Sequence, residues 1–112
     1  MIVDDHDGFR ALARALLQAE GFEVVGEAAD GKSGLEAAAE LAPDLVLLDV
    51  QLPDADGFDI ADRLAAASNP PAVVLVSTRD ATSYRRRLAT TTARGFIPKG
   101  ELSGAALLAL VA

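Results

Sequence analysis

The sequence contains no cysteine and no tryptophan, and aromatic residues make up only 4% of its 112 positions. The lack of cysteine excludes a disulfide-stabilised scaffold and catalysis by a thiol, and it fits a protein of the cytoplasm. No apolar run approaches the roughly 18 residues of a membrane-spanning helix, and the N-terminus lacks the pattern of a signal peptide. We therefore expect a cytoplasmic protein without membrane partners.

Positive charge is also scarce, since 10 lysine and arginine residues face 17 acidic ones and leave a net charge of −7. This balance opposes non-specific binding to nucleic acid or to an anionic membrane, and it suits a domain that holds a divalent cation. A hydrophobic content of 51% with 24% charged residues indicates a globular chain. Its length predicts one domain over residues 1–112.

The sequence is organised around residues 45–57. This stretch opens with four apolar residues, and the turn-forming Pro53 and Gly57 follow, which predicts a short buried parallel strand. Asp49 lies at the C-terminal end of that strand, the edge at which an open α/β sheet binds its ligands. Packing gives no reason for a carboxylate at this point, so Asp49 is either solvated at a loop or serves as a ligand or nucleophile.

Short apolar strands alternate with helical patterns along the rest of the chain. We predict strands over residues 1–3, 23–28, 44–49, 72–76 and 95–98. We predict helices over residues 8–20, 33–41, 58–67, 80–93 and 102–112. The fourth helix is weakly amphipathic and rich in threonine, so we expect it to be the least stable. Right-handed crossovers between such units give a parallel sheet with helices on both faces.

Polar residues follow the predicted strands, and the C-terminal ends of parallel strands lie along one edge of a sheet. These residues are Asp4, Asp5, Asp49, Ser77 and Lys99. Carboxylates crowded together repel one another, and Mg²⁺ with oxygen ligands relieves that repulsion. Lys99 adds a positive charge and Ser77 a hydroxyl donor. Such a set around a free carboxylate suits phosphoryl transfer to an aspartate, which forms an acyl phosphate.

The order of these residues closely resembles the receiver domain of bacterial two-component response regulators, over essentially the whole chain. The residues that carry the resemblance are Asp4-Asp5, Asp49 with Pro53 and Gly57 after it, Ser77, and Gly95-Phe96-Ile97-Pro98-Lys99. The resemblance implies an α/β, flavodoxin-like (βα)5 fold, a doubly wound parallel sheet with strand order 2-1-3-4-5. It also implies a signalling domain that catalyses only its own phosphorylation and dephosphorylation, and not an enzyme acting on other substrates.

By this resemblance, Asp49 is the phosphoacceptor and takes its phosphate from a phosphohistidine on a sensor histidine kinase or a phosphotransfer protein. Asp5, Asp49 and the main-chain carbonyl of Gln51 would hold Mg²⁺, with Asp4 reaching the ion mainly through water. Lys99 would bind one phosphoryl oxygen.

The resemblance also implies a conformational switch. Ser77 would bind a second phosphoryl oxygen and move toward it, and Phe96 matches the aromatic position whose rotamer follows that movement. The signal would appear on the face formed by the fourth helix, the fifth strand and the fifth helix. The positions that flank the phosphoryl group and tune its hydrolysis or access would be Gln51, Thr78 and Arg79.

We expect the module that produces the response to the signal to lie outside these residues, which contain no DNA-binding, nuclease or cyclase module. The ending Phe-Ile-Pro-Lys-Gly-Glu-Leu resembles regulators that continue into a C-terminal helix-turn-helix, so we expect transcriptional control through a further domain. Both ends look trimmed, because three residues precede Asp4 and the last helix has barely three turns. A second copy of the chain is a further candidate partner, and nucleic acid is not expected to bind this domain itself.

One departure from the family concerns the residues around Lys99. Many receivers have proline after the lysine, often with a cis bond, whereas Gly100 follows Lys99 here and Pro98 precedes it. A cis bond at Lys99-Gly100 would cost roughly 2.5–4 kcal/mol. This departure keeps open an alternative function, a degenerate receiver that binds partners without phosphorylation.

Plainer roles stand beside the functional ones. Helix capping could explain Asp4, Asp5 and Ser77, and Lys99 could be an exposed loop lysine. Phe96 could be core filler, and His6 is expected to be a surface histidine. The run Arg85-Arg86-Arg87 could be a solvated face or a surface that binds a partner.

Two other function classes fit the residues less well. A phosphatase of the haloacid-dehalogenase type wants a general acid two residues after the nucleophile, where this chain has Gln51. A flavodoxin would need a Ser/Thr/Gly-rich loop after the first strand to bind the flavin phosphate, and the acidic residues 4–7 would repel it.

Overall fold

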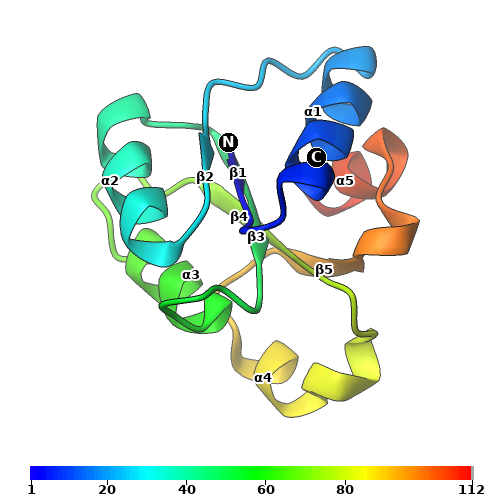
Figure 1. The fold of residues 1–112 in the computed structure, drawn as a ribbon. Helices are drawn as coiled ribbons and strands as arrows, with labels where there is room; N and C mark the ends of the chain where they lie inside the picture. The colour runs from blue at the N-terminus through cyan, green and yellow to red at the C-terminus, as the bar shows by residue number, and fades with distance from the viewer. Residues whose placement is uncertain (112) are drawn as a thin grey trace.

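The computed structural model describes residues 1–111, which form a sheet of five parallel strands with helices on both faces (Figure 1). The strands are β1 (Ile2–Val3), β2 (Glu27–Ala28), β3 (Leu45–Asp49), β4 (Ala72–Ser77) and β5 (Gly95–Pro98). Their order in the sheet is β2-β1-β3-β4-β5, which confirms the predicted topology and places β3 at the centre.

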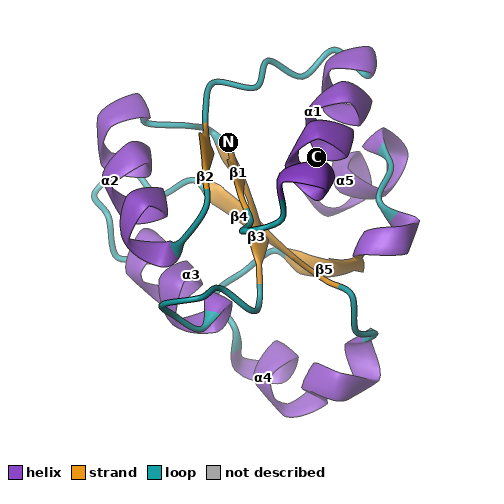
Figure 2. Cartoon of the chain, in the orientation of Figure 1, coloured by secondary structure: helices purple, strands orange, loops and turns teal. Residues whose placement is uncertain are grey.

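The helices divide between the two faces of the sheet, with α1 and α5 on one face and α2, α3 and α4 on the other (Figures 1 and 2). Their bounds are α1 (Asp7–Ala19), α2 (Gly31–Leu41), α3 (Gly57–Ala65), α4 (Arg85–Thr90) and α5 (Gly104–Val111), with 3-10 turns η1 (Ala81–Tyr84) and η2 (Lys99–Glu101). None of the helices within residues 1–111 has the length and apolar character to span a membrane.

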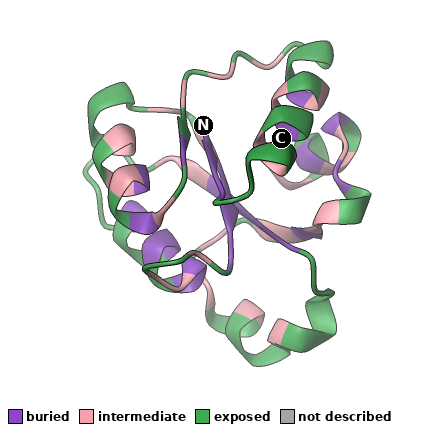
Figure 3. Cartoon of the chain, in the orientation of Figure 1, coloured by how far each residue is buried: buried purple, intermediate pink, exposed green. Residues whose placement is uncertain are grey.

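Side chains from successive positions of each strand enter opposite faces of the sheet, so the apolar runs fill two separate cores. In β3, Val46 and Leu48 join the core beneath α2 and α3, while Leu47 joins the core beneath α1 and α5. In β4, Leu75 and Val74 divide in the same way. Figure 3 shows the central strands buried between the two helical layers. Burial on both faces explains why these strands are continuous apolar runs.

The second strand is shorter than predicted. We predicted residues 23–28, and the structure pairs only Glu27–Ala28 with β1. β2 is an edge strand whose one neighbour is β1, and β1 itself spans Ile2–Val3. Backbone pairing of β2 therefore stops where its neighbour stops, although the apolar pattern of residues 22–25 is that of a strand.

The fourth helical segment is also shorter than predicted and is split. We predicted residues 80–93, and the structure has η1, a six-residue α4 and an extended Thr91 that ends the helix. Neither η1 nor α4 contains a fully buried residue. Threonine runs lower helical propensity through their branched side chains, and little packing compensates here. The low stability expected for this segment stays a prediction.

Candidate functional site

The predicted site residues come from the C-terminal ends of four strands. Asp4 follows β1, Asp49 ends β3, Ser77 ends β4 and Lys99 follows β5 directly. Because the strands are parallel and adjacent, these positions share one edge of the sheet. The structure thus brings together residues that lie up to 95 positions apart in the sequence.

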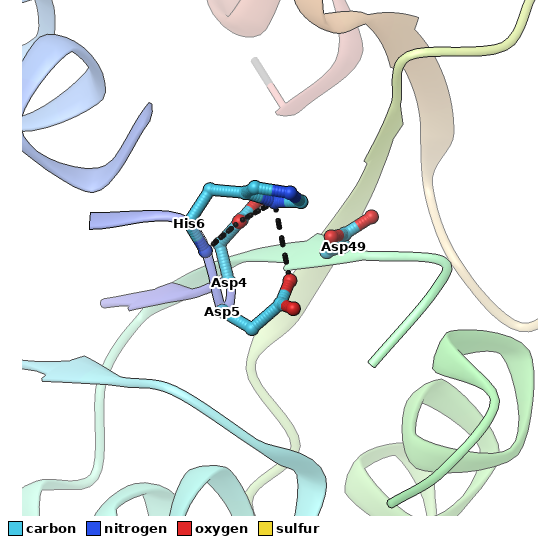
Figure 4. Close-up of side chains that lie close together, drawn as sticks. All are labelled: Asp4, Asp5, His6 and Asp49. Carbon is cyan, nitrogen blue, oxygen red and sulfur yellow. Dashed lines mark hydrogen bonds and ion pairs between the residues drawn. The ribbon is translucent and has the colours of Figure 1, made fainter. Parts of the chain in front are cut away.

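An acidic cluster lies at this edge. Asp4, Asp5, His6 and Asp49 each offer one metal-ligating atom, and these atoms all lie within 4.8 Å of one another (Figure 4). Asp4 is fully buried and Asp49 is 3% exposed, whereas Asp5 and His6 reach solvent. The cluster therefore has a buried floor and an open mouth.

One oxygen of the buried Asp4 carboxylate lacks a hydrogen bond. Its Oδ1 accepts hydrogen bonds from the backbone N–H of His6 at 2.8 Å, and the ring Nδ1 of His6 lies 3.2 Å away. Its Oδ2 lies 2.7 Å from Lys99 Nζ as an ion pair, but without the alignment of a hydrogen bond. Buried polar atoms without such a bond are uncommon, and metal binding is one explanation for them.

The Asp49 carboxylate is held in place by weaker contacts. The backbone N–H of Gln51 donates to Oδ1 at 3.2 Å, and Lys99 Nζ donates to Oδ2 at 3.4 Å. Burial and the nearby negative charge of Asp4 raise the pKa of Asp49, and the contacts with Gln51 and Lys99 oppose that rise only in part. Asp49 is thus a carboxylate poorly compensated for its loss of water.

Lys99 is the cation of the site. Its side chain is 10% exposed, and its Nζ contacts both Asp4 and Asp49. The Nζ also lies 4.6 Å from the centre of the Phe9 ring in α1, a cation–π contact that sequence reasoning missed. The Lys99-Gly100 peptide is trans.

Ser77 has a partner that sequence reasoning also missed. Its side chain is 1% exposed, its Oγ lies 2.9 Å from the Tyr84 hydroxyl, and it accepts a hydrogen bond from the backbone N–H of Arg79 at 3.1 Å. No hydrogen bond joins Ser77 to Asp49 among the described residues. The one available signal for Tyr84 was that it is the only tyrosine of the chain.

The remaining predicted residues surround this centre. Gln51 is exposed in the loop after β3, and Thr78 and Arg79 are exposed in the loop after β4. Phe96 is half-buried, and its ring centre lies 5.6 Å from that of Tyr84. The roles assigned to these residues stay predictions.

Gly57 sets the distance between α3 and the strand that carries Asp49. Its backbone N–H donates to the Val50 carbonyl at 2.7 Å, and a Cβ placed on it would lie 2.3 Å from the Asp49 carbonyl oxygen. No side chain fits there without a backbone shift. Glycine is therefore required for the close start of α3.

Asp54 fixes the loop between β3 and α3 to a neighbouring helix. Its two carboxylate oxygens accept hydrogen bonds from the backbone N–H groups of Gly31 at 2.7 Å and Lys32 at 3.0 Å, at the start of α2. These bonds lower the pKa of Asp54. The loop that follows Asp49 is thus attached to the start of α2 as well as to β3 and α3.

The donor set fits Mg²⁺. The cluster offers carboxylate oxygens from Asp4, Asp5 and Asp49, the ligand type that this hard cation prefers, and Asp4 Oδ2 lacks a hydrogen bond. The open mouth beside Asp5 and His6 leaves room for the waters that Mg²⁺ retains. The site can thus hold a cation beside the buried, partly compensated carboxylate of Asp49.

Comparison with known sequences identifies the family of the chain. The sequence model of the response regulator receiver domain matches residues 1–112. The chain is 38% identical over 101 residues to the virulence factors transcription regulator BvgA of Bordetella pertussis, which covers 90% of this chain and 48% of BvgA. It is 45% identical over 78 residues to protein-glutamate methylesterase/protein-glutamine glutaminase 5 of Myxococcus xanthus, which covers 69% of this chain and 22% of that protein. The chain thus spans about half of the first relative and a smaller share of the second.

Comparison with solved structures gives the same result. The signal receiver domain of the response regulator NarL from Mycobacterium tuberculosis superimposes with a TM-score of 0.83 at 33% sequence identity. The match covers 98% of this chain and 93% of that chain. The fold and the sequence therefore agree over nearly the whole length.

Proposed function

Because the chain belongs to the receiver domain family of two-component response regulators, we propose that it is a signalling switch in which Asp49 accepts a phosphoryl group. The observation that carries this proposal is the juxtaposition of Asp49 with the acidic cluster and Lys99 at one edge of the sheet. The donor would be a phosphohistidine on a sensor histidine kinase or a phosphotransfer protein.

The reacting group is the Asp49 carboxylate. One of its oxygens attacks phosphorus, the P–N bond of the phosphohistidine breaks, and its electron pair leaves with the imidazole, which takes up a proton. The carboxylate must be ionised to attack. Because burial raises the pKa of Asp49, phosphorylation should slow as the pH falls through that raised pKa.

Lys99 stabilises the charge that moves onto the phosphoryl oxygens. Its Nζ lies 3.4 Å from Asp49 Oδ2, so a phosphoryl group on Asp49 comes within reach of the ammonium. Its contacts with Asp4 and with the Phe9 ring hold the side chain over the site before the donor arrives. Preorganised charge of this kind costs no rearrangement during transfer.

Asp5 and Asp49 would hold Mg²⁺, together with the main-chain carbonyl of Gln51, and Asp4 would reach the ion mainly through water. The bound ion would neutralise negative charge on both the carboxylates and the phosphoryl oxygens. Asp4 also keeps Lys99 close, because the pair lies at 2.7 Å.

Phosphorylation would be read out through Ser77 and Phe96. Ser77 would donate a hydrogen bond to a phosphoryl oxygen, and Phe96 would adjust with it, which changes the face formed by α4, β5 and α5. Transcriptional control through a DNA-binding domain outside this chain is the proposed output, supported by the similarity to BvgA. A second copy of the chain is a candidate partner for that face.

The test is incubation with acetyl phosphate and Mg²⁺ followed by intact mass measurement. Wild-type protein should gain the mass of one phosphoryl group, and Asp49→Ala should gain none. Asp7→Asn is the matched control, because its side chain is 91% exposed outside the cluster, and it should be phosphorylated like wild type.

The same assay decides the alternative of a phosphorylation-independent interaction module. Failure of wild type to gain mass would reject the switch in favour of that alternative. Equal gain by Asp49→Ala would reject Asp49 as the phosphoacceptor. Omission of Mg²⁺ should lower the phosphorylated fraction strongly if the acidic cluster holds the ion.

A further inference from the structure

The Ser77–Tyr84 contact joins the proposed phosphorylation site to η1 and α4, a segment without a fully buried residue. Ser77 Oγ and Tyr84 Oη lie 2.9 Å apart, and Ser77 is almost fully buried. Tyr84 is the last residue of η1 and immediately precedes α4. A hydrogen bond between them therefore ties the end of β4 to the segment that begins α4.

Tyr84 is held by rings on both sides. Its ring centre lies 5.8 Å from that of Phe58 in α3 and 5.6 Å from that of Phe96 in β5, with tilted planes in both pairs. Such tilted contacts at these distances are favourable aromatic pairs. Packing thus fixes the direction of the Tyr84 hydroxyl, and the hydrogen bond with Ser77 completes its environment.

The segment around Tyr84 has few other attachments. No residue of η1 or α4 is fully buried, and the side chains of this segment that pack against the core are Tyr84 and Leu88. A further attachment is Arg87, which pairs with Asp56 and lies 4.4 Å from the centre of the Phe58 ring, so the Tyr84 hydrogen bond is one of a small number of contacts that hold residues 81–90. Loosely packed segments of this kind supply the moving parts of switches.

Ser77 cannot serve two partners equally well. The Ser77 oxygen accepts the backbone N–H of Arg79 and lies 2.9 Å from the Tyr84 hydroxyl, where either hydroxyl can be the donor, so its position suits these two partners and changes when the side chain turns toward a third. A phosphoryl group on Asp49 offers strong acceptors at the same edge of the sheet, and charged acceptors compete well against a neutral phenol. Reorientation of Ser77 toward that acceptor leaves the Tyr84 hydroxyl without its partner.

We propose that Tyr84 is a positioning residue that couples Ser77 to the η1–α4 segment, through a hydrogen bond present before phosphorylation and broken by it. This inference rests on the proposed function, and it adds a route separate from Phe96. The Phe96 ring has no polar atom and can respond only through packing. Tyr84 responds through a bond that the Ser77 hydroxyl makes or breaks directly.

The chain supplies its own reporter, because Tyr84 is the only tyrosine and there is no tryptophan. Tyrosine emission of the wild-type protein therefore comes from Tyr84 alone and reports the surroundings of its hydroxyl and its ring. It should change on phosphorylation with acetyl phosphate and Mg²⁺ toward the value of unphosphorylated Ser77→Ala. Ser77→Ala should show no comparable change under the same treatment.

Hydrogen exchange of residues 81–90 provides the second readout. Unphosphorylated Tyr84→Phe should exchange these amides roughly three- to tenfold faster than wild type, the effect of losing one net hydrogen bond. Phosphorylated wild type should approach the same rates. Phe96→Leu, which removes a ring but no hydrogen bond, should keep the emission response of Tyr84.

Intact mass measured on the same samples shows whether a failed emission test refutes only this inference or the proposed function as well. Phosphorylated protein with unchanged Tyr84 emission, or loss of the response in Phe96→Leu, overturns this inference and leaves the proposed function standing. Absence of phosphorylation on wild type overturns both. The emission measurement needs no Tyr84 variant, so it decides the question even if Tyr84→Phe folds poorly.

Discussion

At the residue scale, the site consists of charges that the fold holds close together with little water. Asp4 and Asp49 are both buried, and one ammonium, from Lys99, lies 2.7 Å from the first and 3.4 Å from the second. A buried carboxylate without full compensation costs folding stability and is retained where its reactivity is useful. This cost makes the site measurable in stability experiments as well as in phosphorylation assays.

Asp49→Asn should raise the free energy of unfolding at neutral pH by about 1 kcal/mol, because it removes a buried charge that Asp4 repels and leaves Lys99 paired with Asp4. Burial and Asp4 raise the folded-state pKa of Asp49 above its unfolded value of 3.8, so the ionised group lowers stability above the raised pKa. As the pH falls through that pKa toward the unfolded value, wild type recovers this stability and the difference should shrink. Urea unfolding of wild type and Asp49→Asn from neutral to acidic pH, without divalent cations, measures this difference in the free energy of unfolding.

Asp44→Asn is the control for this substitution, because Asp44 is exposed and its carboxylate makes no hydrogen bond or ion pair within residues 1–111. It should leave the free energy of unfolding nearly unchanged at every pH. The account of Asp49 is contradicted if Asp49→Asn is less stable than wild type at neutral pH.

Gly57→Ala should lower the free energy of unfolding by roughly 1–3 kcal/mol, because the added methyl group would overlap the backbone beside Asp49. Gly8→Ala is the matched control in α1, where nothing lies within 4 Å of the new Cβ, and it should raise stability by about 0.5–1 kcal/mol. Urea unfolding of both variants tests the pair. Equal effects of the same sign would refute the steric explanation.

The sequence predicts the location of those site residues that lie at the ends of strands. Asp4, Asp49 and Lys99 lie at the edge that the strand pattern assigns to them, because residues that end parallel strands have little freedom of place. Tyr84 and Phe9 could not be found this way. Their contacts with Ser77 and Lys99 depend on how helices pack over the sheet, which no local pattern encodes.

At the element scale, the loop after β3 is attached to the start of α2 by Asp54. Asp54→Ala should lower the melting temperature at neutral pH by a few degrees, because the N–H groups of Gly31 and Lys32 lose their acceptor. These bonds lower the folded-state pKa of Asp54, so its contribution is present above the unfolded pKa and is lost as the pH falls through the folded pKa. Thermal melts of both proteins against pH should therefore converge in acid. A constant difference down to the lowest pH would rule out a role for the carboxylate charge.

The element boundaries show where local pattern has limits. The buried strands β3 and β4 match their predicted ranges closely, since a short apolar run between turn signals fits a strand with both faces covered. The predicted strand over residues 23–28 was too long because strand pairing depends on the neighbour, here β1. The helix over residues 80–93 was too long because the pattern does not show how little packing α4 receives.

At the scale of the whole molecule, the alternation of strands and helices and the two-sided burial of the sheet follow from sequence pattern. The strand order 2-1-3-4-5 does not follow from pattern, because several orders satisfy the handedness rule. It came from the resemblance to the receiver family. The acidic edge is therefore a property of the assembled sheet, to which four strands contribute.

Mg²⁺ should raise the melting temperature of the wild-type protein, because an ion that binds only the folded site stabilises it by mass action. The gain reaches about 2.7 kcal/mol when the free ion is at a hundred times its dissociation constant. Asp5→Asn should lose most of this gain, since Asp5 is a proposed ligand at the exposed mouth of the cluster. Thermal melts with and without Mg²⁺ make the comparison. Equal stabilisation of wild type and Asp5→Asn would place the ion elsewhere.

The most direct test of the central claim is chemical identification of the phosphorylated residue. Protein treated with acetyl phosphate and Mg²⁺ is reduced with borohydride, which converts an aspartyl phosphate to homoserine, and is then digested and mapped by mass spectrometry. The account predicts conversion of Asp49 alone, and strongly reduced conversion when Mg²⁺ is left out. Conversion of another aspartate, such as Asp54 in the adjoining loop, or none at all in the presence of Mg²⁺, would contradict it.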